Sequence, residues 1–248
     1  MSQHEITLRS PKGRLILVPA NAADDELVAK LRTDPVTRRY LPYFPESLTV
    51  DEARALREKR AAAGALSFNV HILNPDGTTT FVGITGFQNI VAEHSSAEVG
   101  IILSPDYHRG GIASEALYTL LQYGFEDKKF HRIVFETGAD NVMMKGWLEK
   151  ALGAEQELRK REAWKTPTGY VDIVEYSILD REWLGRMKVH IALVRSNAVI
   201  SAAFHKEGSQ LSRFEHSRTM CNRWQCNIAG DPVNHSGKAT LNSLIVRE

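Results

Sequence analysis

The segment DYHRGGIASEAL, at residues 106–117, combines residue types that can hold an anionic group. Its two adjacent glycines lack a Cβ, so a bulky anion can approach the backbone closely there. An amphipathic run with helical spacing begins directly after them, at Ile112. The first N–H groups of a helix have no partner within the helix and lie at the positive end of its dipole. With His108 and Arg109 as further donors, the segment predicts a seat for a phosphate or pyrophosphate group.

The same segment departs from the two commonest nucleotide-binding motifs. No Lys-Ser/Thr pair follows the glycines, as a P-loop requires, and the Gly-x-Gly-x-x-Gly spacing of a dinucleotide fingerprint is missing. Two other interpretations stay open on these residues alone. The segment could be a tight turn that merely precedes a helix, or part of an enzyme that acts on the phosphates of a nucleotide.

The elements around this segment follow from hydrophobic spacing, caps and turns. Thr49 and Glu52 form a capping-box pattern at a helix start, and NPDG at residues 74–77 predicts a hairpin turn. The segment RRYLPYFPES, residues 38–47, matches neither the helical nor the strand period. This order of elements predicts an α/β (α+β) fold, with a mixed central sheet flanked by helices on both faces. We expect strands at 14–20, 66–73, 80–90, 97–104 and 132–138, a closing hairpin at 163–173 and a last strand at 175–183 that runs into a short helix. We expect helices at 21–33, 49–63, 112–125 and 141–152.

Composition narrows the class of protein. The chain of 248 residues is 43% hydrophobic and has a formal net charge of +1, which gives no general attraction to nucleic acid or to an acidic membrane. It has no apolar run of about 18 residues that would span a membrane, and its first residues lack the apolar core of a signal peptide. Two cysteines do not make a disulfide framework. We therefore expect a soluble, cytoplasmic protein that is a monomer or a homodimer.

Residues 1–185 and 186–248 differ in character. The first segment has regular apolar spacing and should form one domain, whereas the second is turn-rich and should be an irregular or disordered tail. Histidines and cysteines in the second segment have zinc-binding chemistry, but their spacing lacks the close Cys-x2-Cys pair typical of a small zinc site. We predict no metal site from them. These residues are His216, Cys221, Cys226 and His235.

The opening motif resembles that of the GNAT family, the Gcn5-related N-acetyltransferases. His108-Arg109-Gly110-Gly111-Ile112-Ala113 is similar to the family's Gln/Arg-x-x-Gly-x-Gly/Ala, with His108 where Gln or Arg is usual. AEVGIILSPDYHRGGIASEAL, RIVFETGADN and WLEKALGAEQE resemble segments of the ribosomal-protein N-terminal acetyltransferase branch. The resemblance extends over roughly residues 12–183. It implies the GNAT acyl-CoA N-acyltransferase fold and makes 1–185 the N-acetyltransferase domain.

The resemblance implies acetyl-CoA as co-substrate and no metal. In this family the pantetheine arm lies between two strands that separate, and here it would pair with the main chain of Ile101, Ile102 and Leu103. Asn141 would face the cofactor, and it could also cap the helix that follows it. The pyrophosphate would lie on the loop and helix start formed by His108, Arg109, Gly110, Gly111, Ile112 and Ala113.

The resemblance also implies direct transfer of the acetyl group to a primary amine. Glu98 lies where this branch has a carboxylate, and we expect it to be the general base, acting through water. The alternative is a carboxylate that orients the acceptor's ammonium group or pairs with an arginine. A main-chain amide near Ile102 is the expected oxyanion donor. We assign no general acid, because Met144 replaces a serine found in relatives and residues 141–154 contain no tyrosine.

The acceptor should bind between residues 38–47 and 163–173, the two segments that flank the cleft in this fold. The N-terminal amine of a peptide is the first expectation and a small-molecule amine the second. Local packing is the alternative role for the aromatic residues there. A catalytically silent acyl-CoA-binding module is a different class of function, suggested by His108 and by the missing acid. The candidate acceptor-binding residues are Arg38, Arg39, Tyr40, Tyr43, Phe44, Trp164 and Tyr170.

Overall fold

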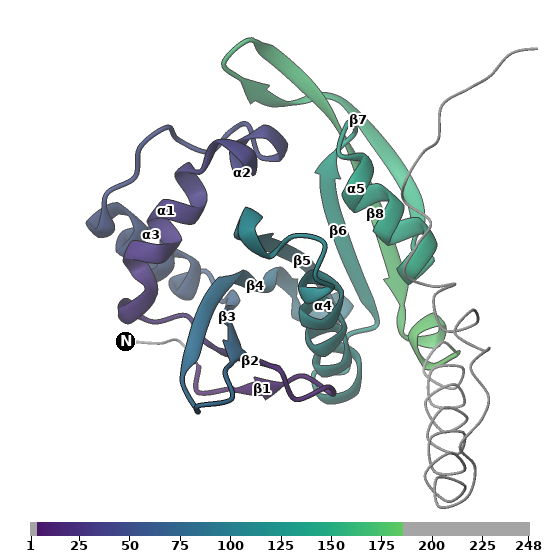
Figure 1. Ribbon diagram of the computed structural model, residues 1–248. Coiled ribbons are helices and arrows are strands. Elements are labelled where there is room, and N and C mark those ends of the chain that lie inside the picture. Colours follow the sequence, from purple (N-terminus) through teal and green to yellow (C-terminus); the bar gives the residue numbers. More distant parts are fainter. Residues whose placement is uncertain (1–3, 186–248) are drawn as a thin grey trace, which may run out of the picture. The chain divides into compact units, whose positions relative to one another are not determined.

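The computed structural model describes residues 4–185. Within this part of the chain, eight strands form one sheet with helices on both faces (Figure 1). None of the described helices is long and apolar enough to cross a membrane. The expected tail at 186–248, which includes His216, Cys221, Cys226 and His235, lies outside the described residues.

The sheet is mixed, as the sequence predicted. Its strands lie in the order β1-β2-β3-β4-β5-β6-β8-β7. All neighbouring strands are antiparallel except β5 and β6, which are parallel. The bounds are β1 Leu8–Arg9, β2 Leu15–Pro19, β3 Leu66–Leu73, β4 Thr79–Val91, β5 Ser96–Leu103, β6 Arg132–Gly138, β7 Glu155–Thr166 and β8 Gly169–Leu179.

The helices divide between the two faces of the sheet. α1 and α3 pack against β3 and β4 from one face, and α4 packs against β1, β2, β4 and β5 from the other. In Figure 1 the first group lies to the left of β3 and β4, and α4 lies to their right. The bounds are α1 Asp25–Thr33, α2 Pro35–Tyr40, α3 Val50–Ala62, α4 Ile112–Gln122 and α5 Val142–Gly146.

Local sequence explains how α3 and α4 form. Thr49 Oγ1 accepts a hydrogen bond from the Glu52 N–H (3.2 Å), and Glu52 accepts one from the Thr49 N–H (2.8 Å), which completes the expected capping box. α4 buries the apolar face that its spacing predicts, with Leu120 and Leu121 fully buried. At Gly124 an added Cβ would lie 2.7 Å from the Phe87 ring, so this glycine allows the end of the helical segment to approach the sheet closely.

The structure corrects three expectations about elements. Residues 38–47 were expected to be irregular, but Pro35–Tyr40 forms α2, whose N-cap Asp34 accepts from the N–H groups of Val36 and Thr37. The expected helix at 141–152 consists of α5 followed by the wider helical turn Trp147–Leu152. β1 was not expected at all, because a two-residue strand has too few residues to show a period.

Candidate active site

β5 and β6 pair with each other only at their beginnings. Their parallel register runs from Ser96↔Arg132 to Glu98↔Val134, although β5 continues to Leu103 and β6 to Gly138. Beyond Glu98, the side of β5 that faces β6 therefore has no partner strand in the described structure. A strand edge of this kind can pair with an extended ligand that takes the place of a strand.

The register between β4 and β5 decides which peptide groups face this opening. Ser104 N–H donates to the Val82 carbonyl at 2.9 Å. In a strand, the N–H and C=O of one residue point to the same side, and successive residues alternate between the two sides. The N–H and C=O of Ile102 therefore also point to β4, and those of Ile101 and Leu103 point to the opening. The Ile102 amide, expected to be the oxyanion donor and a cofactor contact, is therefore turned away, and its neighbour Ile101 presents its amide instead.

The loop after β5 leads directly into the N-terminus of α4. Gly111 is the N-cap residue with φ +73°, a conformation that favours glycine, and Arg109 also has a positive φ of +64°. No side chain caps the helix, so its first N–H groups, at Ile112 and Ala113, are open to a ligand. His108 Nε2 donates to the Leu103 carbonyl (3.1 Å), which ties the loop to β5. This geometry fits an anionic group at the helix start.

Arg14 lies beside this loop, and sequence reasoning missed it. Its Nε donates to Glu115 Oε2 at 2.5 Å, and its Nη2 donates to the Gly110 carbonyl at 3.3 Å. The guanidinium group therefore links the glycine pair to α4, and the carboxylate of Glu115 offsets its charge. Arg14 is 96 residues from Gly110, so no local spacing could have indicated the contact.

Glu98 is held by two side-chain amides. Gln88, directly opposite on β4, donates to Oε1 at 2.6 Å, and Asn89 donates to Oε2 at 2.7 Å. The partners found for Glu98 among the described residues are these amides and not an arginine. Each carboxylate oxygen has room for a further hydrogen bond, so Glu98 can still accept from an ammonium group or from water. Gln88 and Asn89 were also missed from the sequence.

A cavity lies between α1, α3 and the face of the sheet opposite α4. Its empty volume of about 940 Å³ includes space that is open to solvent. Two cross-strand pairs contribute to its floor, Ile84↔Ile102 and Gly86↔Gly100. The next pair along the same face is Gln88↔Glu98, so Glu98 lies one hydrogen bond from the cavity wall.

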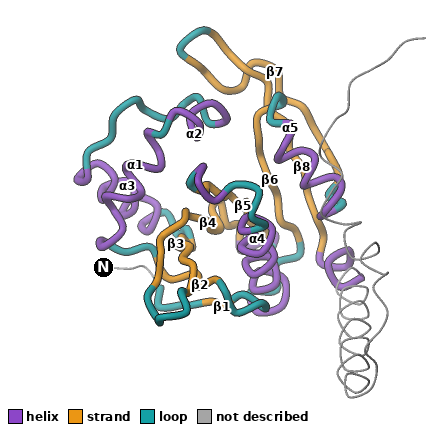
Figure 2. The backbone as a smooth tube through the Cα atoms, in the orientation of Figure 1, coloured by secondary structure: helices purple, strands orange, loops and turns teal. Residues whose placement is uncertain are grey.

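The expected acceptor-binding residues divide into two groups. Tyr43 and Phe44 line the cavity, and the Tyr43 ring contacts the Trp164 ring on β7, with ring centroids 4.8 Å apart. The two segments expected to flank the cleft therefore meet at this contact. Figure 2 shows the β7–β8 hairpin at the top of the view, on the same side of the molecule as α2.

The remaining acceptor candidates do not line the cavity. Arg38 pairs with Glu46 (3.0 Å), and the Arg39 guanidinium lies 5.8 Å from the Tyr40 ring centroid. Tyr170 is 61% exposed on the β7–β8 hairpin. The partners observed for Arg38 and Arg39 belong to the same segment, residues 38–47.

Asn141 caps α5. Its Oδ1 accepts from the Met144 N–H (3.1 Å), and its Nδ2 donates to Thr137 Oγ1 (3.0 Å). The helix-cap interpretation is therefore confirmed. A second Nδ2 hydrogen remains for a ligand, so the expected cofactor contact is still a prediction. Among the described residues there is no cluster of His, Cys, Asp and Glu that could hold a metal ion.

Three features fit an acyltransferase of the GNAT type: the open edge of β5, the uncapped start of α4 next to it, and the cavity on the other face of the sheet. The acetyltransferase (GNAT) domain model matches residues 14–153, which is more than half of the chain. The chain belongs to the GNAT family and is an N-acetyltransferase. The family and the fold expected from the sequence are confirmed.

Individual relatives agree with this assignment. "Uncharacterized N-acetyltransferase YnaD" of Bacillus subtilis (strain 168) is 28% identical over 144 residues, which are 58% of this chain and 82% of YnaD. "Putative ribosomal N-acetyltransferase YdaF" of the same organism is 26% identical over 103 residues, 42% of this chain and 56% of YdaF. The crystal structure of spermidine N-acetyltransferase from Vibrio cholerae in complex with CoA and spermine matches with a TM-score of 0.62 at 22% identity. That match covers 69% of this chain and 98% of the Vibrio chain, and it shows the shared fold.

Proposed function

We propose that this N-acetyltransferase uses acetyl-CoA as its acyl donor and transfers the acetyl group directly to a primary amine. One observation carries the proposal: the unpaired edge of β5 leads from Glu98 to the uncapped start of α4. An extended thioester arm and an anionic tail would need these two features in this order. The Vibrio neighbour, which was crystallised in complex with CoA, supports the same donor.

The donor would be held mainly by main chain. The N–H and C=O groups of Ile101 and the N–H of Leu103 face the opening and can pair with the amides of pantetheine. The N–H groups of Ile112 and Ala113 would bind the pyrophosphate, with the positive charge of Arg109 beside it and Arg14 holding the loop. Since the His108 ring already donates to Leu103, we assign His108 to positioning the loop.

The acceptor amine must lose a proton before it can attack, because a lysine-like ammonium has a pKa of about 10.4. We assign this proton to Glu98, directly or through water. The amine nitrogen then forms a bond to the thioester carbon, and the carbon–sulfur bond breaks. Ile101 N–H faces the region where negative charge develops on the carbonyl oxygen. A thiol has a pKa near 8.5, so the sulfur can leave as thiolate without a strong acid.

The acceptor is a peptide N-terminus or a small-molecule amine. The name of YdaF, a putative ribosomal N-acetyltransferase, favours an amine on a protein, whereas the Vibrio neighbour is a spermidine N-acetyltransferase in complex with spermine. We place either acceptor in the cavity between α1, α3 and the sheet, which is partly open to solvent.

The test is thiol release from acetyl-CoA in the presence of a panel of primary amines, with the acetylated product identified by mass spectrometry. Glu98→Gln keeps the shape of the side chain and should lower kcat about 100-fold or more between pH 6 and 9. Glu93→Gln, an exposed change in the β4–β5 connection, is the matched control and should leave kcat within about twofold. Unchanged turnover by the Glu98→Gln variant between pH 6 and 9 would rule out Glu98 as the general base. Tight binding of acetyl-CoA with no thiol release for any amine would contradict the proposed reaction.

A further inference from the structure

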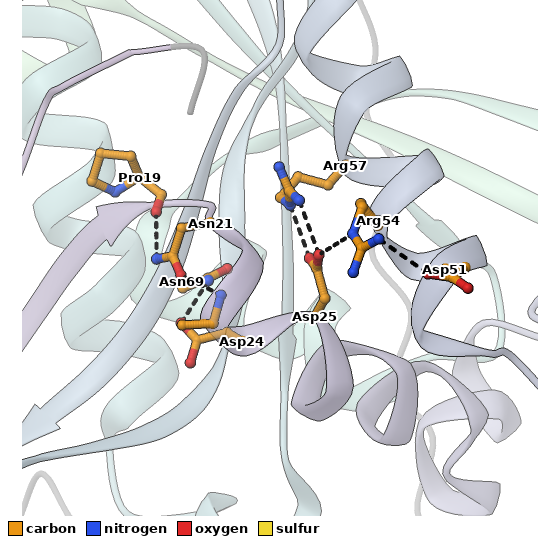
Figure 3. Close-up of polar contacts among 9 residues, drawn as sticks. Pro19, Asn21, Asp24, Asp25, Asp51, Arg54, Arg57 and Asn69 are labelled. Carbon is orange, nitrogen blue, oxygen red and sulfur yellow. Dashed lines mark hydrogen bonds and ion pairs between the residues drawn. The ribbon is translucent and has the colours of Figure 1, made fainter. Parts of the chain in front are cut away.

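Three arginines line the acceptor cavity, and only one of them is neutralised by a carboxylate. Arg57 on α3 donates to both oxygens of Asp25, at 2.8 and 2.9 Å, and Asp25 is buried. Figure 3 shows Arg57 turned toward Asp25, with Arg54, about one turn earlier in α3, near the same carboxylate. This ion pair connects α1 to α3, and the Asp25 carboxylate neutralises the charge of Arg57.

Arg32 on α1 is in a different state. Its guanidinium carbon lies 4.0 Å from the centroid of the Phe44 ring, and its Nε is buried with no hydrogen-bond partner. No ion pair is found for it within residues 4–185. Burial lowers the pKa of Arg32 to about 10, and the nearby charge of Arg60 adds to this effect. A cation held partly out of water without a counter-ion is unfavourable, so a ligand that supplies the counter-ion would be favoured.

Arg60 is the third arginine of the cavity wall. It lies in the last turn of α3, exposed, and it lines the same cavity as Arg32. Arg60 likewise has no ion pair within the described residues. The carboxylate of Asp25 also lines this cavity, but it is bound by Arg57, so Arg32 and Arg60 repel each other and an anion placed between them removes that repulsion. Arginine is well suited to bind carboxylate or phosphate, because its planar fork matches their oxygens.

A carboxylate lies next to the same cavity. Gln88 lines the cavity and donates to Glu98. Tyr43 also lines it, and loss of hydration raises the pKa of its hydroxyl, on which Arg32 and Arg60 act together with the carboxylates of Glu136 and Glu98. The cavity therefore has two arginines without a carboxylate partner in its wall and the general-base candidate one hydrogen bond away.

We propose that the acceptor is an amine that also carries an anionic oxygen group, a carboxylate or a phosphate, bound by Arg32 and Arg60 while the amine faces Glu98. This inference rests on the proposed acetyl transfer and adds the substrate class. The same charges disfavour a polyamine, because its second ammonium group would lie against Arg32 and Arg60.

The experiment compares matched pairs of acceptors that differ only in the anionic group. Suitable pairs are β-alanine with β-alaninamide, phosphoethanolamine with ethanolamine, and a tripeptide amide with glutamate at its second position against its glutamine counterpart; spermidine is added as a polyamine. We expect kcat/KM to be about tenfold or more higher for the anionic member of at least one pair. The pair with the largest ratio identifies carboxylate, phosphate or acidic peptide as the source of the anion.

Variants then locate the effect. Arg32→Gln and Arg60→Gln should each reduce kcat/KM for the preferred anionic acceptor about tenfold or more, while the value for its neutral counterpart changes less than about threefold. Lys30→Gln on α1 and Lys59→Gln on α3 remove an exposed positive charge from the same helices without touching the cavity, and they should preserve the preference. Arg60 is exposed, so its variant keeps the test valid if Arg32→Gln does not fold.

The outcomes separate this inference from the proposed function. Equal kcat/KM within every pair, or an anion preference that survives both arginine variants, overturns the inference while acetyl transfer to amines stands. Faster acetylation of spermidine than of all anionic acceptors also overturns it. Absence of thiol release with every amine contradicts the proposed function itself.

Discussion

A single carboxylate on β7 joins three strands of the sheet. The Glu157 carboxylate accepts from both terminal guanidinium nitrogens of Arg132 on β6 and from Ser177 Oγ on β8 (2.7 Å). β8 lies between β6 and β7, so these side chains bridge a non-neighbouring pair of strands. The hydrogen bonds from Arg132, more than any other cause, lower the pKa of Glu157 from 4.5 to about 2.

This shift predicts the effect of removing the charge. A difference of about 2.5 pKa units corresponds to at most ~3.4 kcal/mol. The Glu157 and Arg132 side chains are 34% and 30% exposed, and solvent screening reduces the contribution to about 1 kcal/mol. Glu157→Gln should therefore lower Tm by about 2–4 °C near neutral pH. Because the folded pKa is depressed, the contribution is complete above about pH 4.5 and is lost as the pH falls toward 2.

The assay is thermal unfolding followed by circular dichroism, for the unaltered chain and for Glu157→Gln, from about pH 6 to about pH 3. The Tm difference between the two should shrink by more than half over this range, since at pH 3 most of the linked contribution is gone. Glu155→Gln, an exposed change at the start of the same strand, is the control and should show little difference at either pH. A Tm gap that stays constant with pH, or no gap near pH 6, would refute the reasoning.

Three further substitutions test the site and its support. At Gly100 an added Cβ meets nothing within 4 Å, so Gly100→Val should change the unfolding free energy by less than about 1 kcal/mol. Because Gly100 lines the cavity, the same change should raise KM for the acceptor about tenfold and leave KM for acetyl-CoA unchanged. An unaffected acceptor KM would mean that the acceptor binds elsewhere. Gly111→Ala places a Cβ on a residue with φ +73° and should lower the unfolding free energy by about 1 kcal/mol. It should also weaken acetyl-CoA binding, as measured by calorimetry. Unchanged affinity would count against this loop as the pyrophosphate site. Thr49→Ala removes the cap of α3 and should cost about 1 kcal/mol in denaturant unfolding, with Thr49→Ser restoring most of it if the hydroxyl is the cause.

Much of the fold could be predicted from the sequence because its signals are local. Strands with alternating or continuous apolar residues, the capping box at Thr49 and the turn at NPDG are each read within a few residues, and the structure confirms them. α2 was missed although a local signal exists, since Asp34 followed by Pro35 is a favourable helix start. The two prolines and three aromatic residues that follow it obscured that signal.

The candidate site combines features that are local in the sequence with contacts that are not. The glycine loop and the start of α4 were predicted from residue type and spacing, because they form one continuous segment, and Glu98 was predicted from the resemblance to the GNAT family. The contacts that complete the site join segments far apart in the chain. Arg14 reaches Gly110 across 96 residues, and Tyr43 meets Trp164 from another part of the sheet. Periodicity tells which residues share a face of one element, but not which distant elements meet.

Tertiary structure alone decided the direction of the β5 peptide groups and the charge of the cavity. Ile102 and Ile101 are neighbours in the sequence, and only the register with β4 turns the amide of Ile101 to the opening and that of Ile102 away from it. Arg32, Arg57 and Arg60 are similar residues on two amphipathic helices. Packing gives Arg57 a carboxylate partner and leaves Arg32 and Arg60 without one among the described residues, so the sequence shows which residues carry charge, and the fold decides which of them face the cavity.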